Sequence, residues 1–264
     1  MRFEQMIYPM YNNTPKLTVV GAGPGDADLI TLKAVKVLES ANVVLYDALV
    51  NPLLLKHAPK AKHIFVGKRK GYKRFSQEEI NEMIVTEAYA HGHVVRLKGG
   101  DSFVFGRGAE EMEYVSQKGL LTDVVPGISS SLAVPAMQNI PLTKRGSSQS
   151  FWVITGTTKE RTISKDIALA AQSTATVVIL MGMSKLPQIV ELFQAEGKHD
   201  LPVAIIQNGT TLHEKIAVGT IDTIEYEVAT NGLSNPAVIV IGEVVRHRET
   251  LLSIHEKVSV KTLL

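Results

Sequence analysis

Short runs of β-branched and other apolar residues alternate with segments of helical periodicity along most of this 264-residue chain. This alternation is typical of folds in which helices cover parallel or mixed sheets, so we expect the α/β class. Five strands are predicted in the first half, at Leu17–Val20, Val43–Tyr46, His63–Val66, Val94–Leu97 and Asp123–Val125. Five more are predicted in the second half, at Phe151–Thr155, Ala175–Leu180, Val203–Ile206, Lys215–Val218 and Ala237–Ile241.

Helices fit between these strands, and several carry recognisable start signals. Thr31 can cap one helix, and Ser76 can cap another whose first turn contains two glutamates. Gly108 precedes a third helix. An amphipathic helix is expected near Lys185–Ala195, between the second and third strands of the second half.

The segment 140–149 interrupts this rhythm with Pro141, Gly146 and a polar cluster, so we place a domain junction there. We predict two α/β domains with mostly parallel or mixed sheets. The predicted ranges are a frayed lead-in over 1–15, an N-terminal domain over 16–142, a C-terminal domain over 143–246 and a C-terminal tail over 247–264. The chain ends soon after the second domain, so a single activity is expected.

The amino-acid composition excludes or disfavours several classes of function. The chain has no cysteine, which excludes disulfides, metal–thiolate sites and thiol nucleophiles and favours a cytoplasmic location. The 28 Lys and Arg residues against 26 Asp and Glu leave a net charge of +2, without the basic excess typical of nucleic-acid binders. The apolar runs are far shorter than the roughly 20 residues that span a membrane. We therefore expect a soluble protein with no metal, no nucleic-acid partner and no membrane partner.

The first glycine motif, residues 19–26, follows a strand and precedes a helix, as in dinucleotide-binding folds. Its last position holds Asp26, where the dinucleotide fingerprint has a third glycine, and a carboxylate there would face a pyrophosphate. Pro24 removes one backbone donor from the same loop. A nicotinamide or flavin cofactor is therefore disfavoured, and a tight turn without a ligand remains the alternative.

A second motif, residues 96–108, should also lie at the carboxyl edge of the sheet. Gly99 and Gly100 suit close approach to a flat ligand, and Asp101 can balance a cationic one. S-adenosylmethionine fits both loops because it carries a sulfonium and an ammonium but no phosphate. Arg107, between two glycines, is a candidate ligand contact, and the alternative is a surface pair with Glu110 or Glu111.

The motifs together resemble the tetrapyrrole methylase family. The matching stretches run in family order from about residue 17 to 246 and comprise residues 20–26, 45–47, 66–69, 76–81, 95–101, 105–108, 125–128, 140–143, 181–182 and 208–210. The resemblance implies two α/β domains with the cofactor in the cleft between them, in a homodimer. It also implies S-adenosylmethionine-dependent methylation of uroporphyrinogen-III to precorrin-2 in two steps, with S-adenosylhomocysteine as the second product.

The resemblance also assigns site residues. For the cofactor it implies Pro24, Gly99, Gly100, Asp101, Val104, Ser129, Ser130, Met181 and Gly209. For catalysis it implies Asp47 and Lys68 in proton transfer, together with Arg107. For the carboxylates of the substrate we expect Arg107, Glu110, Arg145, Lys144 and Arg69.

Four departures from the family pattern stand out. Ser102 replaces a usual proline and Lys144 a frequent histidine. Ser129-Ser130 stands where Thr-Ala is common, and Thr157 stands where a Gly-His pair usually ends a strand. A sibling methylase for a later corrin precursor, or for a protein or RNA substrate, remains an alternative. So do a nicotinamide or flavin oxidoreductase and a catalytically silent regulator. Asp26 disfavours the oxidoreductase, and Asp47, Lys68 and Arg107 together disfavour the regulator.

Overall fold

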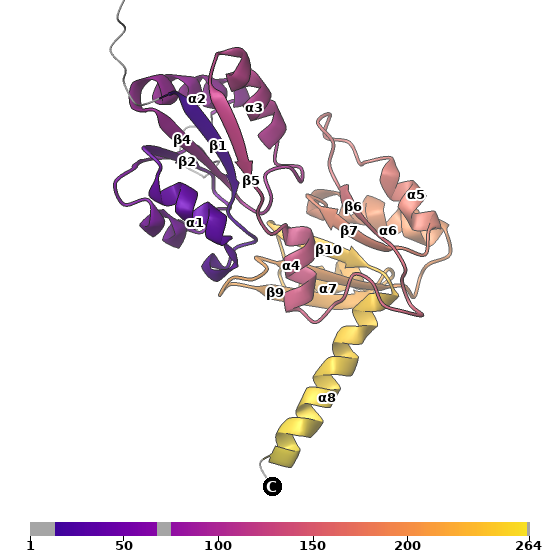
Figure 1. Cartoon of the computed structure of the whole chain (residues 1–264). Coiled ribbons are helices and arrows are strands. Elements are labelled where there is room, and N and C mark those ends of the chain that lie inside the picture. Colours follow the sequence, from indigo (N-terminus) through magenta and orange to yellow (C-terminus); the bar gives the residue numbers. More distant parts are fainter. Residues whose placement is uncertain (1–13, 68–74, 263–264) are drawn as a thin grey trace, which may run out of the picture. The chain divides into compact units, whose positions relative to one another are not determined.

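The computed structural model describes residues 14–67 and 75–262 and divides the chain into two compact units (Figure 1). The first contains the described residues before Pro24 together with Ala27–Gly127. The second contains Pro24–Asp26 and the described residues from Ile128 onward. The boundary therefore lies before the junction predicted at residues 142 and 143, because a helix that the sequence did not predict, α4 (Ser130–Met137), belongs to the second unit.

The first unit is built on a parallel five-stranded sheet in the order β3-β2-β4-β1-β5. Its strands are β1 (Lys16–Gly21), β2 (Val43–Tyr46), β3 (Lys62–Phe65), β4 (His93–Lys98) and β5 (Leu121–Val125). All five predicted strands of this half are confirmed to within a few residues. Because the strands are parallel, the loops after them share one edge of the sheet.

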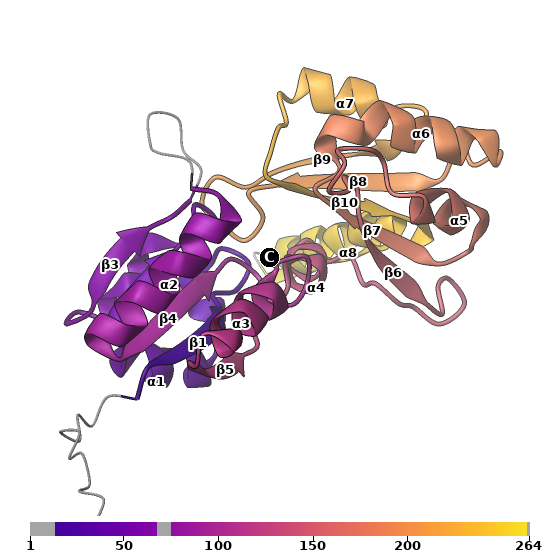
Figure 2. The same ribbon diagram turned by 90° about the horizontal axis from the view of Figure 1, so that it is seen from above.

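Helices cover both faces of this sheet (Figure 2). One face packs against α1 (Leu32–Glu39) and the short η2 (Pro52–His57). The other packs against α2 (Gln77–His91) and α3 (Gly108–Gln117). The short η1 (Ala27–Leu29) precedes α1.

The helix starts predicted from capping residues are confirmed. The Thr31 side chain accepts a hydrogen bond from the Ala34 amide. Ser76 and Glu79 form a reciprocal capping box, in which each side chain accepts a hydrogen bond from the other residue's amide. The sequence signal and the backbone geometry therefore agree at the first turn of α2.

The second unit has a mixed sheet in the order β6-β7-β10-β8-β9, in which β6 and β7 are parallel and the other neighbours are antiparallel. Its strands are β6 (Phe151–Thr155), β7 (Thr176–Leu180), β8 (Pro202–Gln207), β9 (Lys215–Thr220) and β10 (Ala237–Ile241). The five strands predicted here are also confirmed. The ends of β7 and β8 share an edge with the start of β10, because Val238 pairs with Leu180 and Ala237 with Gln207.

One face of this sheet carries a large apolar core with α5 (Asp166–Gln172), α6 (Leu186–Ala195) and α7 (Ile224–Thr230). The helix α6 confirms the amphipathic helix predicted near Lys185–Ala195, and the short η3 (Met183–Lys185) leads into it. The other face packs against α4 and η4 (Glu243–Val245). The segment predicted as a tail contains α8 (Arg246–Thr262), a long helix that extends from the end of η4 (Figure 1). Within residues 14–67 and 75–262, no helix combines the length and apolar character of a membrane span.

Candidate functional site

The two glycine motifs meet at the carboxyl edge of the parallel sheet, because β1 and β4 are neighbours. The Gly23 amide donates to the Gly100 carbonyl at 3.2 Å, and the Gly100 amide donates back to Gly23 at 2.7 Å. A β-carbon on Gly21 would lie 2.5 Å from the Gly127 nitrogen and 2.7 Å from the Gly100 oxygen. The glycines are therefore needed for close packing of three loops on one another.

This pairing also decides which ligands the first loop can hold. The amides of Ala22, Gly23 and Asp26 donate to the Lys98 carbonyl, the Gly100 carbonyl and the Thr210 hydroxyl, respectively. Pro24 has no amide hydrogen. A pyrophosphate needs backbone donors that face it, and these donors are already engaged. The loop geometry therefore disfavours a dinucleotide, in agreement with the prediction from Asp26.

The Asp101 carboxylate stabilises the loops themselves. One oxygen accepts from the Phe103 amide at 2.8 Å, and the other accepts from the Gly127 amide at 3.0 Å. Val104 follows in the same turn, with its amide donating to the Asp101 carbonyl at 3.3 Å. The sequence suggested only a ligand contact for Asp101. The structure adds a second role, since this carboxylate joins the Gly99–Gly100 loop to the loop after β5.

Asp47 lies where β2 ends, at the same edge. Its Oδ1 accepts from the Leu49 amide at 3.0 Å, and its Oδ2 lies 3.6 Å from a terminal nitrogen of the Arg96 guanidinium. The Asp47 side chain is 25% exposed, so the carboxylate is held from the protein side and still reaches solvent. Such a group can accept a proton from a bound molecule.

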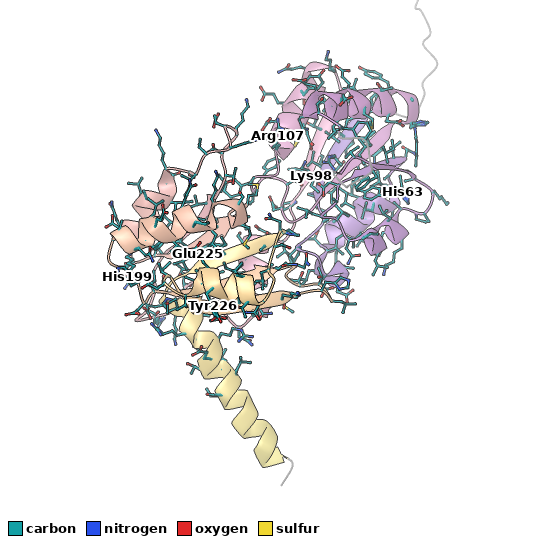
Figure 3. The ribbon with its side chains drawn as sticks, turned by 180° about the vertical axis from the view of Figure 1, so that it is seen from behind. His63, Lys98, Arg107, His199, Glu225 and Tyr226 are labelled. Atoms are coloured by element: carbon teal, nitrogen blue, oxygen red, sulfur yellow. The ribbon has the colours of Figure 1, made fainter. Side chains whose placement is uncertain are left out.

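Next to Asp47, on the protein side, lies a cluster of buried charges that was not predicted from the sequence. Arg96 and Lys98 project from β4, and both reach the carboxylate of Glu111 on α3, at 3.2 and 3.0 Å. Burial lowers the pKa of Lys98, with Arg96 acting in the same direction and Glu111 opposing it. The signal in the sequence was the alternation of Arg96 and Lys98 with apolar residues, which places both on one face of the strand. Figure 3 labels Lys98 within the first unit.

Arg107 forms the surface pair that the sequence left as an alternative. Its guanidinium donates to both oxygens of Glu110, at 3.1 Å from Nε and at 2.6 Å from a terminal nitrogen, and both side chains are exposed. Arg107 has a φ of 60°, in the left-handed region that non-glycine residues seldom occupy. Figure 3 labels this side chain. Lys68 and Arg69, the other cations expected in this part of the chain, lie outside the described residues.

In the second unit, left-handed backbone marks the shared end of β7 and β8. Met181 follows β7 with a φ of 56°, and Asn208 and Thr210 follow β8 with φ values of 50° and 66°. Such conformations cost on the order of 1–3 kcal/mol each and concentrate at functional sites. The predicted cofactor residues Met181 and Gly209 are therefore both found where the backbone is strained.

Contacts within the second unit hold these strained residues in place. The Thr157 hydroxyl donates to the Met181 carbonyl at 2.9 Å. A β-carbon on Gly209 would lie 2.5 Å from the side chain of Val134 on α4, so this loop packs directly on that helix. Ser129 caps α4, with its hydroxyl 2.8 Å from that of Ser131, and Ser130 is the first residue of the helix. Pro24 also belongs to this unit.

The two cations predicted after the expected junction are also in the second unit. Lys144 and Arg145 are exposed on a tight turn closed by a bridge between Lys144 and Ser148. The Lys144 ammonium lies 3.0 Å from Nδ1 of His247. The predicted site residues therefore form separate groups, one at the edge of the first sheet and others in the second unit.

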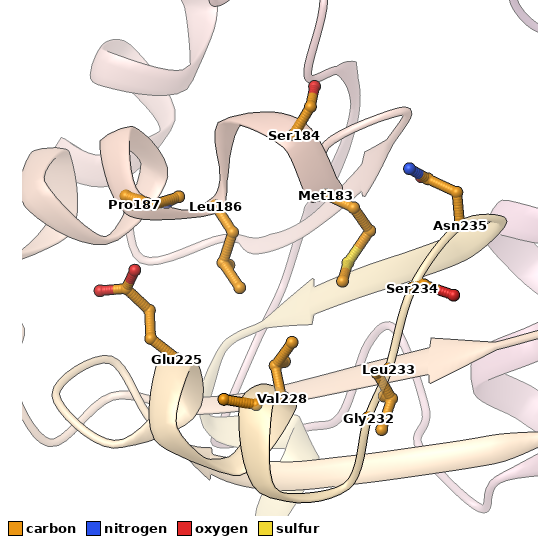
Figure 4. A pocket seen from close by; sticks show the side chains of 11 residues that line it. Met183, Ser184, Leu186, Pro187, Glu225, Val228, Gly232, Leu233, Ser234 and Asn235 are labelled. Atoms are coloured by element: carbon orange, nitrogen blue, oxygen red, sulfur yellow. The ribbon is translucent and has the colours of Figure 1, made fainter.

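A groove of about 490 Å³ in the second unit contains none of the predicted site residues (Figure 4). It runs between η3 with the start of α6 and α7 with the loop before β10, and Met183, Leu186, Val228 and Leu233 contribute apolar side chains. Among the described residues, no group of His, Asp and Glu side chains could hold a metal ion.

Comparisons with known proteins agree with the motif pattern. The model of the tetrapyrrole (corrin/porphyrin) methylases matches residues 16–225. A uroporphyrinogen-III C-methyltransferase of Methanocaldococcus jannaschii is 45% identical over 235 residues, which cover 88% of this chain and 97% of that protein. A siroheme synthase of Tolumonas auensis is 44% identical over 238 residues, and the match covers 89% of this chain but only 50% of the synthase.

A solved structure is similar over nearly the same length. The uroporphyrin-III C-methyltransferase of Thermus thermophilus, complexed with S-adenosylhomocysteine, is 36% identical with a TM-score of 0.76. The match covers 88% of this chain and 99% of the Thermus chain.

Proposed function

We propose a methyltransferase function from the premise that this chain belongs to the tetrapyrrole (corrin/porphyrin) methylase family. The chain transfers methyl groups from S-adenosylmethionine to uroporphyrinogen-III, in two successive steps that give precorrin-2. The observation that carries this proposal is the 45% identity to a uroporphyrinogen-III C-methyltransferase, 97% of which the match covers.

The loop chemistry supports the choice of cofactor. S-adenosylmethionine, when bound, supplies an electrophilic methyl group on a sulfonium centre. A cofactor without phosphate needs no ring of backbone donors, and the amides of Gly23 and Gly100 are already engaged with each other. For the cofactor we propose the residues carried over from the family: Pro24, Gly99, Gly100, Asp101, Val104, Ser129, Ser130, Met181 and Gly209.

For the chemical step, the protein has to orient an electron-rich pyrrole carbon, exclude water and accept a proton. We assign proton transfer to Asp47, because one of its oxygens accepts from the Leu49 amide, the other faces the Arg96 guanidinium at 3.6 Å, and the side chain remains partly exposed. Lys68 is the second proposed proton-transfer residue. Arg107 would bind substrate carboxylates or stabilise developing charge, and to do so it must exchange Glu110 for the substrate.

For the carboxylates on the rim of the substrate we propose Arg69, Lys144 and Arg145, together with the Arg107–Glu110 pair. The exposed positions of Lys144 and Arg145 are compatible with this role. We also propose a cytoplasmic homodimer without nucleic-acid or membrane partners. Analytical ultracentrifugation of the purified protein would measure the oligomeric state, and a stable monomer would contradict that part.

The function is tested by incubating the purified protein with uroporphyrinogen-III and methyl-labelled S-adenosylmethionine under reducing conditions. The expected product carries two additional methyl groups by mass spectrometry. Calorimetric titration provides an independent check, because S-adenosylhomocysteine should bind and NAD should not. Transfer of label to a later corrin precursor but not to uroporphyrinogen-III would support the sibling methylase instead. Tight NAD binding without methyl transfer would overturn the family assignment of the cofactor.

A further inference from the structure

Four charged side chains form a continuous cluster under the carboxyl edge of the parallel sheet. The side chains of Arg96, Lys98 and Glu111 are 4%, 8% and 0% exposed, and Asp47 lies at the outer end of the cluster. Burying an ion costs several kcal/mol even after the protein relaxes, and replacing such a cluster by apolar residues is often stabilising. Such a cluster is therefore a poor means of stabilising a fold. Its position next to Asp47 instead indicates a role in the candidate site.

The strand pattern explains how the cluster is built. Arg96 and Lys98 lie two residues apart on β4, on the same face as Val94, and α2 and α3 cover that face. Glu111 comes from the first turns of α3, and Gln77 of α2 donates to the same carboxylate oxygen at 3.0 Å. Two helices and one strand therefore fix the position of Glu111.

The Arg96 side chain contacts more groups than the Lys98 side chain does, and Asp47 is one of them. Its Nε donates to Glu111, and one terminal nitrogen donates to the carbonyls of Leu45 and Leu97 at 3.4 and 3.1 Å. The remaining terminal nitrogen lies 3.6 Å from the Asp47 carboxylate. Two of the three guanidinium nitrogens are thus held by hydrogen bonds, and the third faces Asp47. The Lys98 ammonium has Glu111 as its only hydrogen-bond partner among the described residues.

We infer that Arg96 is a positioning residue for the reaction, which holds the Asp47 carboxylate in place while a polycarboxylate substrate is bound. This inference rests on the proposed function. Substrate carboxylates close to Asp47 would repel its carboxylate, and the buried guanidinium 3.6 Å away on the protein side opposes that displacement. Glu111 in turn anchors Arg96, because a rigid guanidinium fork can be aimed only if its other nitrogens are bound.

The main test compares Arg96→Gln with Lys98→Met, since each removes one cation from Glu111 and leaves it the other. Arg96→Gln should lower kcat by about 30- to 100-fold, which approaches the lower end of the roughly 100- to 10,000-fold that general-base catalysis contributes. Its affinity for S-adenosylhomocysteine should stay within about three-fold of wild type. Arg96→Lys should recover only part of kcat, because an ammonium cannot reproduce the fork.

A double-mutant cycle separates positioning from general damage. In an Asp47→Asn background, Arg96→Gln should cost less than about three-fold in kcat, because the group that it positions is already gone. Lys98→Met should lower kcat less than Arg96→Gln does. Multiplicative losses in the cycle, unchanged kcat in Arg96→Gln, or equal losses of kcat in both single variants would each overturn the inference.

Carboxyl ¹³C NMR of Asp47 keeps the inference testable if no tetrapyrrole is methylated. The Asp47 carboxyl resonance at neutral pH should shift more in Arg96→Gln than in Lys98→Met, and an unchanged resonance in Arg96→Gln would reject the positioning role. Failure of the wild-type protein to methylate would reject the proposed function alone. If Arg96→Gln does not fold, Arg96→Lys retains a cation beside Glu111 and is measured in the same way.

Discussion

The predicted site residues of the two units lie in different structural surroundings. At the edge of the first sheet the distinctive feature is side-chain charge, since Arg96, Lys98 and Glu111 are buried together beside Asp47. At the edge of the second sheet it is backbone shape, since Met181 and Thr210 both occupy left-handed conformations. The second unit's large apolar cluster draws on residues from Ile154 to Ile241, and no charged side chain of that unit is among the buried residues that the structure describes.

This difference suggests that the two units contribute differently to the reaction and to cofactor binding. A parallel sheet brings the ends of consecutive strands to one edge, so charged groups from several strands can converge there. A mixed sheet with antiparallel neighbours places strand ends beside strand starts, and its exposed loops can present backbone groups to a ligand. We therefore expect the chemistry to be most sensitive to charge changes in the first unit, and cofactor affinity to backbone support in the second.

The largest expected effect is the loss of the carboxylate in the first unit. Glu111→Ala leaves two buried cations without their shared partner, and breaking a buried ion pair in this way typically costs about 3–5 kcal/mol. Urea denaturation would measure the loss. Glu110→Ala is the matched control, since its exposed side chain pairs only at the surface, and it should change stability by less than about 0.5 kcal/mol. Equal stabilities for the two variants would contradict the proposed importance of the cluster.

The pH dependence of Glu111→Ala is an additional check on the same cluster. Glu111 raises the pKa of Lys98 against the burial that lowers it below its ordinary value of 10.5, so removing Glu111 lowers that pKa further. Arg96 and Asp47 still face the ammonium in the variant. Between the lowered folded pKa and 10.5 the unfolded state binds more protons than the folded state, so stability should rise with pH in that window. The rise should be larger in Glu111→Ala than in wild type, and it should disappear when Lys98→Met is added.

Local patterns predicted the strands well, and contacts between distant residues explain what the sequence left out. All ten strands follow from apolar runs and turn residues, and the capping box at Ser76 is a local signal. The helix α4 was missed because it begins with serines and contains Pro135, which hides its periodicity. That omission also displaced the predicted domain junction.

The same distinction applies to the site. Asp47 could be proposed because it matches a proton-transfer position of the family pattern, but Arg96 looked like one charged residue in an apolar run. Its burial depends on Glu111, fifteen positions later in the sequence and on another element. The bond from Thr157 to Met181 joins residues even further apart, which is why Thr157 appeared only as a departure from the family pattern.

A smaller effect, on cofactor affinity, is expected when the hydrogen bond from Thr157 to Met181 in the second unit is removed. Thr157→Val keeps the side-chain shape but loses the hydroxyl that holds the Met181 carbonyl. A neutral hydrogen bond contributes about 1 kcal/mol, so affinity for S-adenosylhomocysteine should fall about five-fold in calorimetric titration. Thr157→Ser should restore it.

Thr158→Val is the matched control for this prediction. The Thr158 hydroxyl lies 2.9 Å from that of Thr162 and makes no contact with Met181, so its loss should leave cofactor affinity within two-fold of wild type, roughly the error of such a titration. Equal weakening in both variants would mean that the loop as a whole, and not the bond to Met181, supports the cofactor.

The smallest expected effect concerns Ser102, which stands where the family usually has proline. The residue is buried, no described group accepts a hydrogen bond from its amide, and its hydroxyl has no partner among the described residues. Proline would therefore remove no native donor bond and would restrict the unfolded chain. Ser102→Pro should stabilise the first unit by roughly 0.4–1 kcal/mol, measured by thermal and urea denaturation.

Ser102→Ala separates the two possible sources of this gain. Alanine removes the unpartnered hydroxyl but not the freedom of the unfolded chain, so any stabilisation that it gives reports the buried polar atom alone. A larger gain from proline than from alanine would assign the difference to chain entropy. A clear loss of stability in Ser102→Pro, with alanine neutral, would mean that the ring does not fit against Gly106 and Gly108, which pack tightly on Ser102. In that case the loop has diverged in shape from its proline-containing relatives, and the serine is an adaptation to that shape.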